Sequence, residues 1–276
     1  MSTTVASSPV HRTRAEVGID APAAAVHRAL TDVGGWPVLY PWIAHTEVLS
    51  RQGPHDEVKF WAVRPGPEGG LRVWTSRRTV DPVALRMEFE QQGSVGPIRQ
   101  LGGTWDFLPR PDGGCRVVSG HWFTTDADPA ETAGELDRHG ALQMRTLKDR
   151  TEHPETLTDD VVRAQDSVLL PGPAAAVRAR LLDALPRRDG TDSAWFGTVE
   201  GTPTVQIAHE EHTLVQKFLT PPEPAQLYRL RWRLAEEPGG TRVTADVLAV
   251  AGDHRDRVRA LAGAGVRAAL ALAGQR

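Results

Sequence analysis

Residues 17–30 read VGIDAPAAAVHRAL, and residues 168–181 read VLLPGPAAAVRARL. Each segment predicts a short strand, a proline in the first turn of a helix, and an amphipathic helix. Proline suits that turn because its φ is already helical and its missing N–H would have no partner there. A local pattern that returns within one chain indicates a repeated structural unit. The chain is therefore predicted to contain the same unit twice.

A second pair of segments returns in the same order. Residues 105–117 read WDFLPRPDGGCRV, and residues 232–243 read WRLAEEPGGTRV. Both predict two strands joined by a turn at a Gly-Gly pair, which is typical of an antiparallel hairpin. Two matches in one order are much harder to attribute to chance than either match alone.

The two pairs differ in their spacing. Pro173 follows Pro22 by 151 residues, whereas Arg242 follows Arg116 by 126 residues. The second copy is therefore about 25 residues shorter, and we expect it to lack roughly one hairpin between residues 183 and 205.

Periodic patterns supply the remaining elements. Residues 84–90 alternate, with Leu85, Met87 and Phe89 on one face, which predicts a strand. Further strand candidates cover residues 58–63, 71–80, 103–108 and 115–125. Each copy ends in a helical pattern, at residues 130–150 and 254–272. This long helix is the available cover for one face of each antiparallel sheet.

The predicted fold class is α+β, with two tandem helix-grip domains. Each domain is expected to be a curved antiparallel sheet wrapped on a long C-terminal helix. The first should cover residues 11–152 and the second, shortened, residues 161–276. The acidic stretch between them, which contains a proline, is interpreted as a linker.

Composition narrows the class of protein. A formal net charge of -3 and 40% hydrophobic residues indicate a globular protein without an electrostatic footprint for nucleic acid. The single cysteine, Cys115, excludes an internal disulfide, and no secretory signal is evident, so a cytoplasmic location is expected. The longest apolar stretch, near residues 268–273, is too short to span a bilayer. His209-Glu-Glu-His212 lacks the H-E-x-x-H spacing, so no metal site is expected there.

Three motifs in the first copy are more specific. They are GWPVLY at residues 35–40, VW at 73–74 followed by SRR at 76–78, and GTW at 103–105. Together they resemble the aromatase/cyclases of bacterial type II polyketide synthases, which have a START/Bet v 1-like helix-grip fold. The motifs cover about residues 14–150, and the repeat extends the resemblance over 161–276. Two tandem copies are similar to the di-domain subclass of that family.

The resemblance implies a function and its partners. Such an enzyme directs a regiospecific intramolecular aldol cyclisation of a poly-β-ketone, here the first ring (C7–C12), followed by dehydration to an aromatic ring. The substrate would be carried on the phosphopantetheine arm of an acyl carrier protein, and a ketosynthase/ketoreductase complex would be a further partner. The resemblance implies neither a metal nor a redox cofactor.

The chemistry of the residues is compatible with this substrate. A poly-ketone is uncharged and flexible, so its pocket should be apolar and aromatic with few polar groups. Six of the eight tryptophans precede residue 123, which indicates either a large core or an aromatic-lined pocket in the first copy. The expected substrate contacts are Trp36, Tyr40, Trp74, Ser76, Trp105 and Phe123, with Trp42 and Trp122 as further candidates. For each aromatic residue the alternative is core packing, and the counterpart Trp232 indicates a partly structural Trp105.

Arg78 is the first catalytic candidate. Period two along its strand places Trp74, Ser76 and Arg78 on one face. A guanidinium there would donate hydrogen bonds to a ketone or enolate oxygen. The alternative is a paired cation at the rim of the cavity.

His121 is the second catalytic candidate, because it shares a strand face with Val117, Ser119 and Phe123. Histidine exchanges a proton near neutral pH. The alternative is a core histidine that is hydrogen-bonded to a neighbour. Counting from the Gly-Gly turns makes Val247 the counterpart of His121 in the second copy and, roughly, Val205 the counterpart of Arg78. The second copy would then lack both groups, which predicts an active first pocket and a degenerate second one.

Asp137 is the third catalytic candidate. It follows the apolar stripe residue Leu136 on the first C-terminal helix, where its carboxylate would orient His121 or hold a water. The alternative is a solvated carboxylate. Two further functions stay open for the whole chain, a non-catalytic carrier of hydrophobic ligands and a scaffold within a synthase complex, because a fold does not determine its chemistry.

Overall fold

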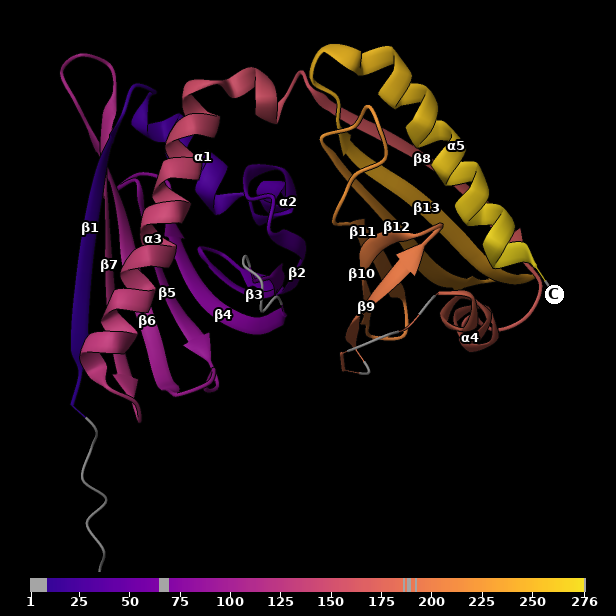
Figure 1. Ribbon diagram of the computed structural model, residues 1–276, viewed down its shortest axis with the longest axis horizontal. Helices are drawn as coiled ribbons and strands as arrows, with labels where there is room; N and C mark the ends of the chain where they lie inside the picture. Colours follow the sequence, from indigo (N-terminus) through magenta and orange to yellow (C-terminus); the bar gives the residue numbers. More distant parts are fainter. Residues whose placement is uncertain (1–8, 65–69, 186, 188–189, 192, 276) are drawn as a thin grey trace, which may run out of the picture. The chain divides into compact units, whose positions relative to one another are not determined.

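The computed structural model describes residues 9–64, 70–185, 187, 190–191 and 193–275. The chain divides into two compact units, of which the first ends at Pro154 and the second begins at Glu155. Each unit is an antiparallel sheet with a long C-terminal helix across one face (Figure 1). The predicted α+β class with two helix-grip folds is therefore confirmed.

The first unit contains a seven-stranded sheet in the order β1-β7-β6-β5-β4-β3-β2. Its elements are β1 (His11–Ile19), α1 (Ala23–Thr31), α2 (Trp36–Leu39), β2 (Ile43–Gln52), β3 (His55–Val63), β4 (Leu71–Asp81), β5 (Arg86–Gln92), β6 (Ile98–Pro109), β7 (Cys115–Thr125) and α3 (Pro129–Glu152).

Local sequence explains the helices of this unit. Helix α1 begins directly after Pro22, as predicted, and buries Val26 and Leu30. Helix α3 begins where the Asp128 carboxylate accepts the N–H of Ala130 at 2.7 Å, which satisfies a donor that the first turn leaves unpaired. Leu136, Gly140, Met144 and Leu147 form its buried stripe, which is the periodicity that predicted the helix.

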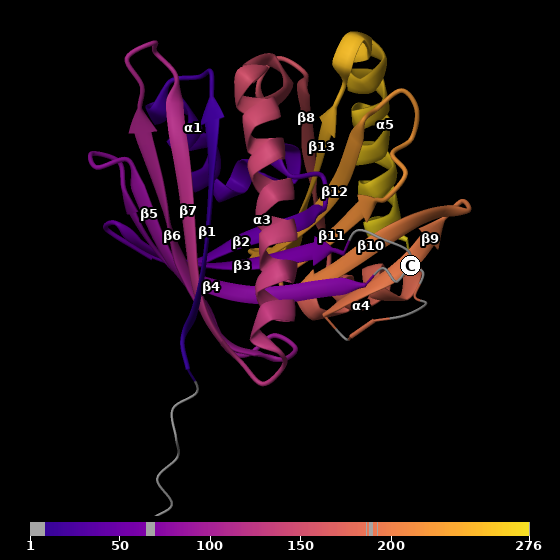
Figure 2. The same cartoon turned by 60° about the vertical axis from the view of Figure 1, so that its left-hand side comes forward.

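The position of α3 leaves part of the sheet uncovered. The helix packs mainly along β1 and touches β7, α1 and α2, and Figure 2 shows it running lengthwise beside these strands. The inner faces of β3, β4 and β5 lie farther across the sheet. Space under the helix is therefore expected over the middle strands, where the predicted site residues are carried.

The second unit contains a six-stranded sheet in the order β8-β13-β12-β11-β10-β9. Its elements are β8 (Val161–Leu170), α4 (Ala174–Ala184), β9 (Ala194–Val199), β10 (Thr202–His209), β11 (Thr213–Phe218), β12 (Leu227–Glu237), β13 (Gly240–Val250) and α5 (Arg255–Gly274). Counted from the last strand, the residues described here contain no counterpart of α2 and β2. The second copy is shorter by a short helix and one strand, so the expectation of a missing hairpin was wrong in its detail.

Strand register confirms the repeat residue by residue. Trp105 pairs with Ser119 on β7, and Trp232 pairs with Ala245 on β13. Two residues farther along the last strands stand His121 and Val247, which are therefore equivalent, as the sequence predicted.

The counterpart predicted for Arg78 is off by one residue. Val80 pairs with Met87 in the first sheet, and Ala208 pairs with Leu214 at the equivalent position of the second. Arg78 therefore corresponds to Gln206 and not to Val205. Gln206 points to the inner face of the sheet, and Val205 points to the opposite face. The count along the sequence crossed a shortened connection, where one residue of offset changes the face.

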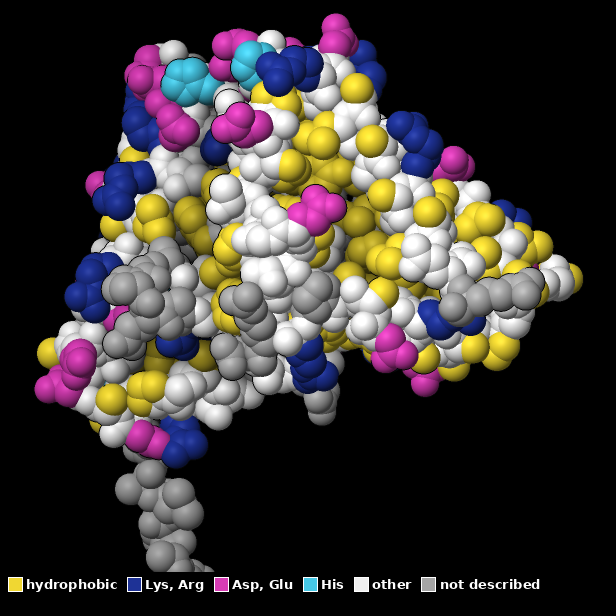
Figure 3. Space-filling model, turned by 45° about the vertical axis from the view of Figure 1, so that its right-hand side comes forward, with side chains coloured by type: hydrophobic (Ala, Val, Ile, Leu, Met, Phe, Trp, Pro, Cys, Tyr) yellow, Lys and Arg dark blue, Asp and Glu magenta, His cyan; other side chains and the backbone are white. Residues whose placement is uncertain are grey.

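The surface charge and the composition of the helices bear on the expectations from the sequence. Acidic and basic side chains lie interspersed over the face drawn in Figure 3, in keeping with the small formal net charge of -3. No helix in these ranges combines the length and the apolar character needed to cross a membrane.

Candidate active site

Two adjoining cavities lie between the sheet and α3 of the first unit, with volumes of about 150 and 160 Å³. Five residues line both of them, namely Trp36, Arg72, Trp74, His139 and Gln143. The first cavity continues along the inner sheet face to Ser76, Arg78, Trp105 and His121, and the second continues to Tyr40 and Trp42. The structure thus brings most of the predicted site residues to one place.

Phe123 is the predicted contact that lies elsewhere. It is fully buried in a small core cluster with Ile98, Leu101 and Leu136, and its ring lies 5.4 Å from that of His11. Trp122, a further candidate, belongs to the opposite face of the sheet. Phe123 does share a face of β7 with His121, as predicted. Its position farther along the strand, however, places it beyond the cavity.

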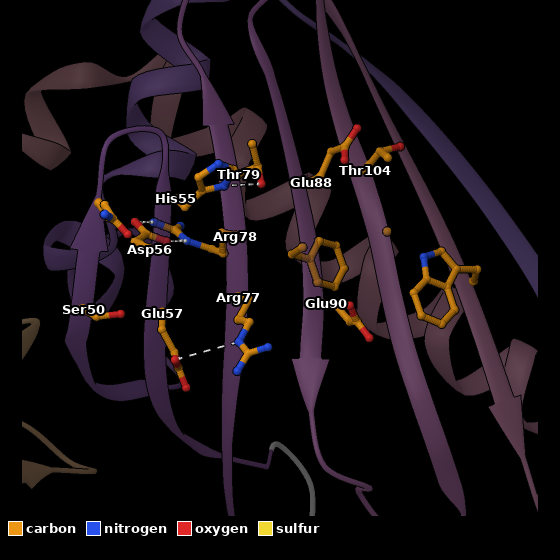
Figure 4. A pocket seen from close by; sticks show the side chains of 14 residues that line it. Ser50, His55, Asp56, Glu57, Arg77, Arg78, Thr79, Glu88, Glu90 and Thr104 are labelled. Atoms are coloured by element: carbon orange, nitrogen blue, oxygen red, sulfur yellow. Dashed lines mark hydrogen bonds and ion pairs between the residues drawn. The ribbon is translucent and has the colours of Figure 1, made fainter.

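Arg78 is held in a buried ion pair. Its Nε donates to Oδ1 of Asp56 at 2.8 Å and its Nη2 to Oδ2 at 2.7 Å, and both side chains are at most 4% exposed (Figure 4). Nη2 also donates to the carbonyl of Thr31 at 3.2 Å. The nitrogen left for a ligand is Nη1, which lies 3.8 Å from the sulfur of Met87. Two of the three nitrogens of this guanidinium are therefore already paired, as in the alternative of a paired cation, and one is left for a ligand.

Asp56 was missed by the sequence analysis. It lies directly opposite Arg78, because the register of β3 on β4 pairs these two residues. Period two does place Asp56 on the same face as Val58 and Phe60, and an acid in that row was the available signal. Such a row does not show which neighbouring strand supplies the cation.

His121 is poised to accept a proton. Burial lowers its pKa below the usual value, and the charge of Asp137 raises the pKa by less. Nδ1 lies 3.5 Å from the hydroxyl of Thr13, and the ring meets Phe89 edge-on at 5.8 Å between centroids. The imidazole is therefore neutral at pH 7. Because Nδ1 lies beside Thr13, Nε2 is the ring nitrogen left for a ligand of the cavity that His121 lines.

Asp137 does not orient His121 directly. Its side chain is exposed on α3, and no hydrogen bond joins the two residues in the described structure. Its contribution is an electric field that favours the imidazolium form. The alternative of a solvated carboxylate fits its position.

Aromatic rings form the walls of the cavities. Trp74 stacks on Phe60 with ring centroids 5.0 Å apart, and Trp36 meets Tyr40 edge-on at 5.2 Å. The indole of Trp36 donates to the carbonyl of Leu30 at 2.7 Å, so its orientation is fixed. Tyr40 is fully buried, and burial raises the pKa of its phenol far above the usual value. Tyr40 therefore stays protonated and can act only as a neutral donor or acceptor.

A larger hollow, separate from the two inner cavities, lies on the outer face of the same sheet and has a volume of about 570 Å³ (Figure 4). Its walls carry the charged side chains of Glu57, Arg77, Glu88 and Glu90 together with Trp122. An uncharged, flexible ligand has little to gain from such walls, because their polar groups would have to give up water. The inner cavities are the better candidate site.

The two C-terminal helices differ in the space beneath them. A methyl group added at Gly140 of α3 would meet no atom within 4 Å, whereas one added at Gly265 of α5 would lie 1.9 Å from the hydroxyl of Tyr228. Tyr228 occupies the position that Leu101 has in the first unit, four residues before the equivalent tryptophan. Together with Trp232 it belongs to the apolar core that fills the second unit beneath α5.

Comparison with known proteins places this site in a family. The model for "polyketide cyclase / dehydrase and lipid transport" matches residues 19–137, which include most of the residues that line the cavities. A putative polyketide cyclase of Streptomyces cyaneus is 30% identical over 154 residues, which are 53% of this chain and 97% of that protein. The chain belongs to the polyketide cyclase family. The resemblance seen in the sequence motifs is thereby confirmed.

Two further proteins extend the comparison. The granaticin polyketide synthase bifunctional cyclase/dehydratase of Streptomyces violaceoruber is 33% identical over 172 residues, 61% of this chain and 52% of that protein. The chain therefore matches about half the length of this curated relative. The crystal structure of the di-domain ARO/CYC BexL from the BE-7585A biosynthetic pathway has a TM-score of 0.78 and 24% identity, and covers 96% of this chain and 97% of that one. That likeness concerns the fold.

Proposed function

We propose that this protein is a polyketide aromatase/cyclase. It would fold a poly-β-ketone in the cavities of the first unit, close the first ring between C7 and C12, and dehydrate the product. The observation that carries this proposal is a neutral, half-buried His121 that shares an aromatic cavity with the hydrogen-bond donor Arg78. Aldol closure needs these two groups, a base for the α proton and a donor for the developing oxyanion.

The proposed reaction begins with proton transfer to His121. Nε2 removes a proton from a methylene between two carbonyl groups, and the resulting enolate carbon forms a bond to a distant ketone carbon. The ketone oxygen becomes an alkoxide and takes the proton back from His121. A second proton then leaves the same carbon to His121, and the hydroxyl group departs with that proton as water. One carbon–carbon bond forms, one water is lost, and His121 is regenerated.

Arg78 would stabilise the alkoxide through Nη1. The ion pair with Asp56 fixes the plane of the guanidinium, so the donor is oriented before the substrate arrives. The aromatic walls would hold the chain in a folded conformation. Positioning of this kind can contribute up to roughly 7–11 kcal/mol to lowering the barrier in ideal cases.

The proposed partner is an acyl carrier protein that presents the chain on its phosphopantetheine arm. A poly-β-ketone is reactive and cyclises without direction, so it requires a carrier until the first ring has formed. The granaticin relative is named as part of a polyketide synthase, which supports this setting and a ketosynthase/ketoreductase complex as the source of the chain.

The second unit would have no catalytic role of its own. Val247 replaces His121, and Gln206 replaces Arg78. The amide of Gln206 is satisfied by its neighbours, because it donates to Thr204 at 3.1 Å and accepts from Gln216 at 3.3 Å. No base is left at the position where the first unit has one.

A reconstituted assay tests the proposed function. The full chain would be incubated with the minimal synthase, the carrier protein and the ketoreductase, and the products separated by chromatography. We expect one cyclised product in place of the mixture formed without the protein. An unchanged mixture in the presence of folded protein would contradict catalysis and would favour the carrier or scaffold.

A further inference from the structure

Arg72 occupies the junction of the two inner cavities. It lies on β4 in the same row as Trp74 and Ser76, and it lines both cavities. Its guanidinium lies over the ring of Trp74 at 5.2 Å from the centroid. Nη2 donates to Oε1 of Gln91 at 3.3 Å. The group is therefore held in a defined plane by one aromatic ring and one neutral amide.

The charge of Arg72 is not neutralised as that of Arg78 is. Within the described ranges Arg72 forms no ion pair, and its Nε and the Nε2 of Gln91 are buried without a hydrogen-bond partner. Two charged groups act on Arg72. Arg64, which directly follows β3, lowers the pKa of Arg72, and Glu135 on α3 raises it. His139 of α3 also lines the junction. Burial is the largest influence and lowers the pKa, but arginine remains protonated at neutral pH.

A half-buried cation and two enclosed donors without partners, in an aromatic cavity, point to a ligand with negative charge. We propose that Arg72 and Gln91 form a subsite for the enolate of a 1,3-diketone unit of the substrate. The planar enolate spreads one charge over two oxygens, which matches the paired N–H groups of a guanidinium. This subsite rests on the proposed function, since a poly-β-ketone is a chain of such units.

The subsite would act on a different part of the chain from His121. One methylene proton is released to water when the diketone ionises, and no bond to carbon forms or breaks at Arg72. A chain that crosses the junction would be anchored there by one enolate, while another part of it lies at His121 and Arg78. Arg72 would thus determine which carbon atoms meet, as a residue that sets regiospecificity.

The subsite can be tested with benzoylacetone, a 1,3-diketone whose enolate absorbs at longer wavelength than its neutral form. The pKa of benzoylacetone would be measured by absorbance titration with the whole 276-residue chain in excess. We expect the wild-type protein to lower the pKa of the probe by about 1–2 units, as a cation within hydrogen-bond distance does. Arg72→Met should abolish this shift, and Arg72→Lys should restore part of it.

Arg77→Gln is the matched control, because Arg77 is an exposed arginine on the outer face of the same strand, and it should leave the shift intact. Circular dichroism would verify that each variant is folded. A wild-type protein that leaves the pKa of the probe unchanged, or a folded Arg72→Met variant that keeps the shift, would overturn the subsite.

The cyclisation assay, run in parallel, separates the two proposals. Cyclisation by a wild-type protein that does not shift the probe would leave the proposed function standing and remove the subsite. A shift that depends on Arg72, without any change in the polyketide products, would support the subsite and contradict cyclisation. If both hold, Arg72→Met should redirect the substrate to misfolded products while His121 and Arg78 remain in place.

Discussion

At the scale of single residues, the site depends on a buried ion pair. Asp56 and Arg78 are both almost fully enclosed, and each satisfies the other through two hydrogen bonds. Breaking such a pair from one side leaves a charge buried without a partner, which is far more costly than never having formed the pair.

Asp56→Ala should therefore destabilise the protein strongly. We expect a loss of about 3–5 kcal/mol in the free energy of unfolding, measured by urea denaturation. Glu57→Ala is the control. Glu57 follows Asp56 in the chain and points to the outer face, where its Oε2 lies 4.0 Å from Nε of the exposed Arg77. It should change stability by less than about 1 kcal/mol. Equal effects of the two substitutions would mean that the Asp56–Arg78 pair does not support the fold.

The protonation of His121 sets the expected pH dependence. Burial lowers its pKa, so the imidazole is neutral above its ordinary value of 6.5 and becomes protonated only at lower pH. The unfolded chain binds that proton more readily, so this contribution to stability is complete above pH 6.5 and is lost as the pH falls below it. A base must be unprotonated to act, so catalysis should fail in the same range.

The rate of cyclisation should therefore rise with pH through a midpoint below 6.5. The measurement is kcat/KM for cyclisation between pH 5 and 8, with His139→Gln as the control variant. Its histidine also has a pKa lowered by burial but lies on α3. The control should keep the same acid limb. A midpoint above 6.5 would contradict a neutral His121 as the base.

Residue-scale prediction from sequence succeeded where alternation alone determines the face. Arg78 and His121 were placed on the cavity side of their strands because period two is a property of one strand. Asp56 required the register between two strands, which the sequence of neither contains. Arg72 lies in the same row as Arg78, two residues before Trp74 and within the predicted strand 71–80. Extending the alternation back to the start of that strand was the signal that would have found it.

At the scale of elements, the two C-terminal helices occupy equivalent positions but pack differently. Helix α3 lies over open space at Gly140, while α5 lies against the sheet at Gly265. Small residues along α5, including Ala262 and Ala269, allow this close approach, and the indole of Trp232 donates to the carbonyl of Ala269 at 3.1 Å.

The same substitution should have opposite effects in the two helices. Gly140→Ala should stabilise the protein by up to about 1 kcal/mol, because alanine is the better helix former and its methyl group meets nothing. Gly265→Ala should destabilise it by about 1–3 kcal/mol, because its methyl group would overlap Tyr228. Urea denaturation of both variants checks this, and a stabilising Gly265→Ala would show that α5 is not packed tightly on the sheet.

Filling the first cavity should remove activity without unfolding the protein. Gly140→Leu places an apolar side chain in the space beneath α3, where the substrate is proposed to bind. We expect cyclisation to fall at least ~10-fold, the size of effect that a misplaced substrate produces. Circular dichroism should stay unchanged. A folded Gly140→Leu variant with full activity would place the reaction outside this cavity.

The sequence offset between the repeats predicted the amount of the missing chain but not its identity. A count of residues cannot distinguish two strands from a short helix and one strand, because both use a similar length. The structure shows that the absent elements are those at the edge of the sheet, next to the cavity that the first unit possesses. Loss of an edge strand leaves the remaining hydrogen-bonded ladder intact, which explains why the shortened sheet still forms.

At the scale of the whole molecule, one fold occurs twice, and the residues proposed for catalysis are present in only one of the two described units. The first unit combines the proposed base His121, the oriented donor Arg78 and an open aromatic cavity. In the second, the base is replaced by Val247, the arginine by Gln206, and the space beneath the helix by Tyr228. The fold and the replacement of His121 by Val247 could be predicted from the sequence. The closure by Tyr228 could not, because it depends on how closely α5 approaches the sheet.

The most direct test of this account is the effect of His121→Gln on the products made from a carrier-bound poly-β-ketone. Glutamine keeps the approximate size and a hydrogen-bonding group but cannot accept the proton. The account predicts a folded variant whose rate of directed cyclisation falls by ~10²–10⁴, the usual contribution of a general base, so that spontaneous products dominate the chromatogram. A folded His121→Gln variant that forms the wild-type product at the wild-type rate would contradict it.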